Sequence, residues 1–149
     1  MPGWVASDRG VATGAAAVDL DGDGFDELVA SYGNDIEPGP VVVYDNDEGR
    51  LLPTPTWRSA VDGYHAHIAV GDVDGDGDPD VIVSRYLGDS GWGSPGGVDL
   101  YENVDGVLTP SPVWIRDGLN SFSCALGDVD RDGDLDLAVA AGEAYQGRA

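Results

Sequence analysis

Carboxylate side chains alternate along three short segments of the chain. The segments are VDLDGDGFDELVAS (18–31), GDVDGDGDPDVIVS (71–84) and GDVDRDGDLDLAVA (127–140). Counted from the first aspartate of each segment, carboxylates occupy positions one, three, five and nine, and position six is always glycine. Alternate carboxylates on a tightly turning backbone can converge on one point, and glycine permits the positive φ that such a turn needs. Carboxylates this close repel one another unless a cation lies among them.

The donor set indicates which cation this is. Several carboxylates with a backbone carbonyl at position seven form an oxygen-only shell, which selects a hard ion, and the number of ligands favours Ca²⁺ over Mg²⁺. An EF-hand is excluded because position twelve is Ala30, Val83 or Val139 instead of glutamate. A metal-free hairpin with Asx turns is the alternative. Three calcium sites are predicted, with ligands Asp19, Asp21, Asp23, Phe25 and Glu27; Asp72, Asp74, Asp76, Asp78 and Asp80; and Asp128, Asp130, Asp132, Asp134 and Asp136.

Strands are expected on both sides of each loop. YHAHIAVGD, before the second loop, alternates strictly, so that His65 and His67 should share one face. A short apolar run follows each loop and suits a strand covered on both faces. A third strand is expected at about 41–45 and 98–102. The fourth strand carries prolines and should be outermost, because proline cannot donate a ladder hydrogen bond. No helix is expected.

The whole chain repeats this arrangement. The first aspartates of the loops recur at intervals of 53 and 56 residues, and Trp4, Trp57 and Trp114 precede them at a nearly constant distance. Four strands in 40–60 residues is typical of a β-propeller blade. We therefore expect an all-β fold of four-stranded antiparallel blades. The units are a partial blade around 1–10, repeats at about 11–58 and 59–115, and a partial repeat at 116–149. About two and a half to three blades indicate a fragment or a protomer of a larger ring.

Composition excludes several classes of partner. The formal net charge is −21, from 28 acidic and 7 basic residues. Nucleic acids and anionic membrane surfaces both require a basic protein surface, so neither is expected as a partner. No run of residues is long and apolar enough for membrane insertion, and MPGWVASDRG lacks the apolar core of a signal peptide. The single Cys124 is part of an apolar alternation with Phe122 and Leu126 and is interpreted as a buried structural thiol.

The loop pattern resembles a known family. DxDxDG-x-x-D between two strands, within GDVDGDGDPDVIVS, resembles the FG-GAP/VCBS repeats of integrin α-like propellers. The YDNDEG and YENVDG turns, followed by PTPTW or SPVW, resemble the bacterial VCBS form. This resemblance implies blades around an axis, with calcium held in the hairpin between the first and second strands. It also implies an extracellular or cell-surface location.

The resemblance implies a non-catalytic, calcium-stabilised module for adhesion, recognition or assembly. Its partners would be a protein or a glycan, with further blades or other copies of the chain to close the ring. One alternative is a carbohydrate-binding lectin, with Tyr86 and Trp92 in the long loop SRYLGDSGWGSPGG as candidate ligand contacts. A less favoured alternative is an accessory domain of a secreted enzyme. His65 and His67 form a minor candidate for a transition-metal pair.

Overall fold

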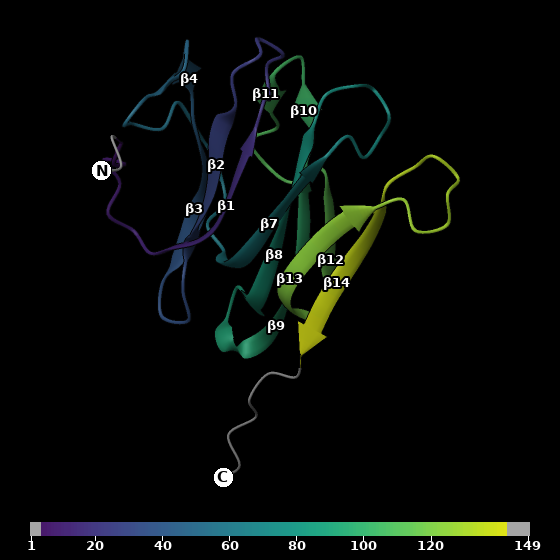
Figure 1. The fold of residues 1–149 in the computed structure, drawn as a ribbon. Coiled ribbons are helices and arrows are strands. Elements are labelled where there is room, and N and C mark those ends of the chain that lie inside the picture. Colours follow the sequence, from purple (N-terminus) through teal and green to yellow (C-terminus); the bar gives the residue numbers. More distant parts are fainter. Residues whose placement is uncertain (1–3, 143–149) are drawn as a thin grey trace.

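The computed structural model describes residues 4–142, and this part of the chain contains strands and no helix (Figure 1). It accordingly offers no helix of the length and apolarity needed to cross a membrane. The ends of the first and last predicted repeat units lie outside the described residues. The strands are β1 (Ala12–Val18), β2 (Glu27–Gly33), β3 (Pro38–Tyr44), β4 (Asn46–Asp47), β5 (Arg50–Leu51), β6 (Trp57–Arg58), β7 (Tyr64–Gly71), β8 (Asp80–Gly88), β9 (Gly91–Tyr101), β10 (Asn103–Val104), β11 (Val107–Leu108), β12 (Trp114–Asp117), β13 (Asn120–Gly127) and β14 (Asp136–Gly142).

The strands form antiparallel sheets that we call blades. Blade 1 has the order β1-β2-β3-β6, blade 2 the order β7-β8-β9-β12, and blade 3 consists of β13 and β14. Small hairpins, β4–β5 and β10–β11, join the third strand to the fourth in blades 1 and 2. The expected all-β fold is confirmed, and the sheets stay open within the described part of the chain. The expected outer place of the proline-flanked strands is also confirmed, because β6 and β12 lie at sheet edges.

The first strands of the three blades lie side by side, with β7 between β1 and β13 (Figure 1). Between blades 1 and 2 lies the largest apolar cluster, which contains Val29, Val41, Ile68, Val81 and Val83. These β-branched side chains suit a pleated surface and are 5% exposed or less. The apolar runs of the first two repeats therefore lie in strands buried on both faces, as predicted. The prediction is wrong for the third run, residues 137–139, because β14 is half-buried or exposed along its length.

Tryptophans join successive blades. The indole N–H of Trp57, on β6 of blade 1, donates to the Leu108 carbonyl of blade 2 at 2.9 Å, and its ring meets Tyr101 edge-on. Trp4 makes the equivalent contacts, with the Leu52 carbonyl and Tyr44. The third member, Trp114, is 46% exposed. Inter-blade packing explains the spacing of Trp57. An edge-to-face pair of this kind stabilises the fold by about 1 kcal/mol beyond the contribution of the buried apolar area.

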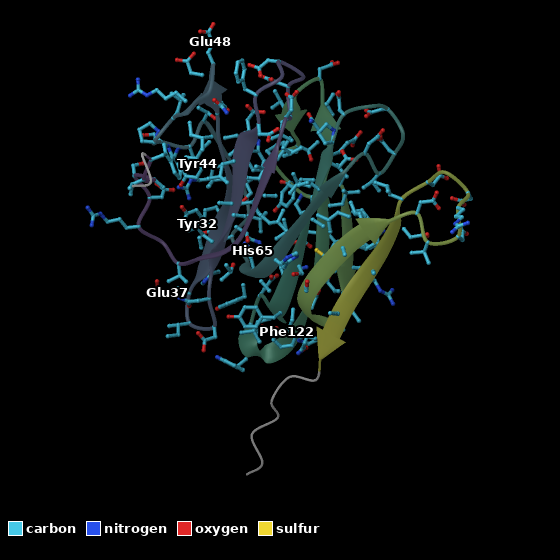
Figure 2. All side chains as sticks on the ribbon, in the orientation of Figure 1. Tyr32, Glu37, Tyr44, Glu48, His65 and Phe122 are labelled. Carbon is cyan, nitrogen blue, oxygen red and sulfur yellow. The ribbon has the colours of Figure 1, made fainter. Side chains whose placement is uncertain are left out.

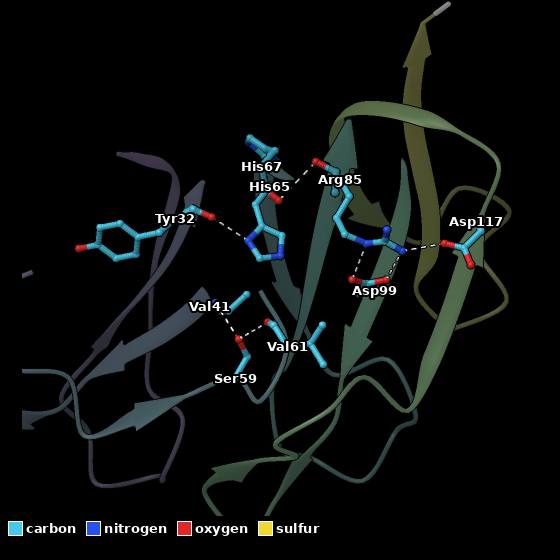
Figure 3. Close-up of polar contacts among 10 residues, drawn as sticks. Tyr32, Val41, Ser59, Val61, His65, His67, Arg85, Asp99 and Asp117 are labelled. Carbon is cyan, nitrogen blue, oxygen red and sulfur yellow. Dashed lines mark hydrogen bonds and ion pairs between the residues drawn. The ribbon is translucent and has the colours of Figure 1, made fainter. Parts of the chain in front are cut away.

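A bulge in β7 separates the two histidines. The register shifts between His65, which pairs with Arg85, and His67, which pairs with Ser84. The Nδ1–H of His65 donates to the Tyr32 carbonyl of blade 1 (Figure 3), whereas His67 lies 4.0 Å from the Cys124 sulfur of blade 3. The expectation that these side chains share one face is therefore wrong, because the extra residue of a bulge changes the alternation. Cys124 is buried, as expected.

Arg85, which pairs with His65 across β7 and β8, forms a buried ion pair with Asp99 of blade 2. Its guanidinium makes two hydrogen bonds to the Asp99 carboxylate, at 2.7 and 2.9 Å, and a third to Asp117 at 2.8 Å (Figure 3). The Arg85 and Asp99 side chains are 9% and 8% exposed. Removing one partner of such a pair leaves an uncompensated buried charge, which costs about 3–5 kcal/mol. The bidentate pair therefore fixes β8 against β9.

The burial of His65 should make the stability of the protein depend on pH. Burial lowers the pKa of His65 from 6.5 to about 4, against the Tyr32 hydrogen bond, which raises it. The unfolded chain thus binds the proton first, so this contribution is complete above pH 6.5 and lost as pH falls towards 4. Between pH 7 and pH 5 the wild type should lose about 2 kcal/mol of unfolding free energy through this residue. Urea unfolding at both pH values checks this, with His65→Asn as the comparison. An equal pH dependence in the variant would contradict the assignment.

Candidate metal centre

The three acidic loops connect β1 to β2, β7 to β8 and β13 to β14, and Figure 1 shows those of blades 1 and 2 at the same end of the molecule. Each folds by the same hydrogen bonds. The position-one aspartate accepts the N–H groups of positions four and six, as Asp19 does from Gly22 and Gly24. The aspartates at positions three and five each accept the N–H two residues later. The same bonds recur in the second and third loops.

Two loop positions require a left-handed backbone. Position six does so in every loop, with φ between 92° and 102° at Gly24, Gly77 and Gly133. Position four does so too, and the sequence prediction missed it although glycine stands there in two of the three loops. Arg131 occupies that place in the third loop with φ 66°, a conformation that costs a side-chain-bearing residue about 1 kcal/mol.

The turn brings three carboxylates of each loop together. Oxygen atoms from positions one, three and nine lie within 4.8 Å of one another, which is the spacing that a shared cation needs. The groups are Asp19, Asp21 and Glu27; Asp72, Asp74 and Asp80; and Asp128, Asp130 and Asp136. The position-five aspartates, Asp23, Asp76 and Asp132, are outside these groups and stay predicted ligands. So do the position-seven residues, of which Asp78 accepts the Asp105 N–H with its side chain.

Position nine is where the site meets the core. Glu27 and Asp80, the first residues of β2 and β8, are 4% and 2% exposed. Burial raises the pKa of Glu27, against the Leu20 N–H that hydrogen-bonds to it, and the charges of Asp21 and Asp23 raise it further. Burial also raises the pKa of Asp80, against two backbone N–H groups. Desolvation and neighbouring carboxylates both disfavour the ionised form, and a bound cation reverses the second effect.

The donor set fits a hard divalent cation. All the convergent groups are carboxylate oxygens, and the backbone turns at glycines. In two loops the position-nine carboxylate is buried, and both its burial and its acidic neighbours disfavour the ionised form. Each loop would hold its ion through positions one, three and nine. The ion would supply positive charge that joins the turn to the start of the next strand.

Sequence reasoning missed two asparagines that support these loops. Asn46 and Asn103 occupy equivalent places just after the third strand of blades 1 and 2. The amide of Asn46 donates to the Asp26 carbonyl of its own loop. Asn103 is fully buried and donates both to its own loop, at Pro79, and to the loop of blade 1, at Leu20. The signal was available in YDN and YEN, where asparagine recurs after the tyrosine.

The expectation of a long loop at SRYLGDSGWGSPGG is wrong, because β8 and β9 extend through it as a paired hairpin with a turn at residues 89–90. The two aromatic residues lie on different strands of this hairpin. Tyr86, on β8, is half-buried and stacks on Phe122 of blade 3 with ring centres 6.1 Å apart. Trp92, at the start of β9, is 59% exposed, and its indole N–H donates to the Asp35 carbonyl of blade 1. Figure 2 places Phe122 at the opposite end of the molecule from Glu48 in the β4–β5 turn. Tyr86 therefore packs, while Trp92 keeps an accessible ring.

Comparison with protein families identifies the repeats that contain these loops. The FG-GAP-like repeat matches residues 19–83 and 88–139, which together are most of the chain. The chain belongs to this family. The FG-GAP repeat also matches residues 66–101, from β7 through the second loop to the end of β9. A comparison with curated proteins gave no match. Both matches include the whole second acidic loop, and the expected resemblance to FG-GAP repeats is confirmed.

Asp80 and Asp136 provide a matched pair of substitutions. Asp80 accepts hydrogen bonds from the Val73 and Asn103 N–H groups, whereas the exposed Asp136 accepts one, from Val129. Asp80→Ala leaves two backbone donors unpaired and should lower the free energy of unfolding by about 2–4 kcal/mol, even in EGTA. Asp136→Ala should cost well under half as much. Urea unfolding in EGTA measures both, and equal costs would show that the burial of Asp80 is not decisive.

Proposed function

We propose that this FG-GAP repeat chain is a non-catalytic, calcium-binding propeller module. The observation that carries the proposal is the recurrence of one carboxylate triad, at positions one, three and nine, in three loops with the same hydrogen bonds. FG-GAP repeats generally lack catalytic activity, which supports a binding or structural role. Calcium in each loop would neutralise the carboxylates and join the turn to the buried strand. Its binding free energy would therefore become folding free energy.

We place the module outside the cell, in adhesion, recognition or assembly. Extracellular calcium is abundant enough to occupy loop sites of modest affinity, and FG-GAP repeats occur in extracellular proteins. Trp114 supports an assembly role. Trp4 and Trp57 each dock on a tyrosine and a backbone carbonyl of the following blade. By the same pattern the exposed ring of Trp114 would dock on a third strand of blade 3, which consists of β13 and β14 within residues 4–142. Such a strand would be supplied by the same protein or by another copy.

Chelation tests the calcium proposal. A site held at one hundred times its dissociation constant adds about 2.7 kcal/mol to the unfolding free energy. With two or more sites filled, millimolar calcium should raise the melting temperature by about 10 °C or more over EGTA. The control variant combines Asp19→Ala, Asp72→Ala and Asp128→Ala, which should remove the calcium-dependent rise whatever their effect in EGTA. The proposal would be refuted if the wild type had the same melting temperature in calcium and in EGTA.

Light scattering on the same samples tests the assembly role. A discrete oligomer in calcium that dissociates in EGTA would support closure of the ring by copies of this chain. Trp114→Ala should then weaken the oligomer, because the indole loses its docking contact. A single-chain mass in both buffers would exclude self-assembly and leave blades from elsewhere as the partner.

A second candidate function, glycan binding, rests on Trp92. Its ring is held in place by the Asp35 hydrogen bond yet 59% exposed, and a fixed aromatic face can stack on a sugar ring. A glycan array with the wild type should then give hits that Trp92→Ala abolishes. Trp114→Ala is the matched control, because it removes an equally large exposed indole from β12. Hits that survive Trp92→Ala would rule out this site.

A further inference from the structure

The β10–β11 turn of blade 2 lies between two of the acidic loops. On one side it contacts the loop of its own blade, where the Asn103 N–H donates to the Asp80 carboxylate at 2.9 Å and the Asp105 N–H donates to Asp78 at 3.1 Å. On the other side it reaches the loop of blade 1. Gly106 approaches so closely that a side chain there would have its Cβ 2.9 Å from the Cβ of Asp21. Two candidate metal loops therefore share one short turn.

Asn103 makes this contact specific. Its amide nitrogen donates to the Leu20 carbonyl of the first loop at 2.8 Å and to the Pro79 carbonyl of the second at 3.2 Å. Both partners are acceptors, so the amide must present its NH₂ group to them. The side chain is fully buried, and losing it would leave both carbonyls without this donor. One amide thus holds position two of the first loop and position eight of the second.

We propose that Asn103 is a positioning residue that couples the two loops, so that calcium binding at either raises the affinity of the other. The coupling rests on the proposed function. An ion in the second loop fixes Asp80 and its neighbours, and through them the β10–β11 turn. The turn then holds Leu20 and Asp21 of the first loop in their binding geometry, so that the first ion orders less backbone. Linkage requires the same factor in both directions.

Blade 1 contains a natural comparison. Asn46 stands at the equivalent place, and within residues 4–142 its amide donates to Asp26 of its own loop and to no second acidic loop. The second comparison is the third loop, where Asp136 is exposed and no turn of this kind contacts the loop within residues 4–142. Asn46 should therefore support one loop without coupling two, and the third loop should bind independently of Asn103.

NMR of the whole chain can test the coupling site by site. The amide signals of Gly24, Gly77 and Gly133 report calcium occupancy of the three loops separately. Asp74→Ala with Asp76→Ala removes two exposed carboxylates and disables the second loop. The calcium midpoint of Gly24 should then rise by about fivefold or more, while that of Gly133 stays unchanged. This arm needs no substitution at Asn103, so it remains informative even if Asn103→Ala fails to fold.

The second arm repeats the comparison in variants. In Asn103→Ala, disabling the second loop should no longer move the Gly24 midpoint, whereas in Asn46→Ala it should still do so. An unchanged Gly24 midpoint in the first arm, or full coupling in Asn103→Ala, would overturn the inference while calcium binding stands. If the three glycine amide signals of the wild type do not shift when calcium is added, the proposed function and the coupling are both overturned.

Discussion

The structure depends on a carboxylate that begins a buried strand. Glu27 and Asp80 lie at the first positions of β2 and β8, almost without solvent. Each accepts the N–H of loop position two and so closes the loop on the strand. The apolar residues that follow form the core between blades 1 and 2. The same residue ends the acidic loop and starts the core strand. A displacement of the candidate metal site would therefore also displace the strand that carries the hydrophobic core.

Burial at position nine comes from neighbouring elements. Asp80 and Asp136 stand in nearly identical sequences and make the same bond to position two, yet one is buried and the other exposed. The difference is the third strand and its following turn, which cover Asp80 with Asn103. The electrostatic demand for a cation therefore differs between loops of the same composition. The loop sequence alone predicts the ligands, whereas the third strand and turn of the same blade determine how deeply the position-nine carboxylate is buried.

Local patterns made much of the fold predictable. The glycine and aspartate spacing specified the loops, apolar runs specified the buried strands, and prolines specified the outer strand, because each acts on its own backbone. The features that escaped prediction are long-range. Asn103 bonds a carbonyl 83 residues away, and Arg85 pairs with Asp99 across two strands. The β7 bulge reversed one expected face, since a single shifted residue changes the alternation without leaving a compositional trace.

The candidate metal loop of blade 2 and the exposed Trp92 lie at opposite ends of β8. The acidic loop of blade 2 leads directly into β8, and Trp92 lies near the start of β9, beside the far end of β8. Between them run Val81 and Val83, both fully buried, and the Arg85–Asp99 pair that fixes β8 to β9. An ion at the loop cannot contact a partner at Trp92 directly. Under the proposed function, an ion would act on Trp92 only through the strand that connects them, which is a structural role.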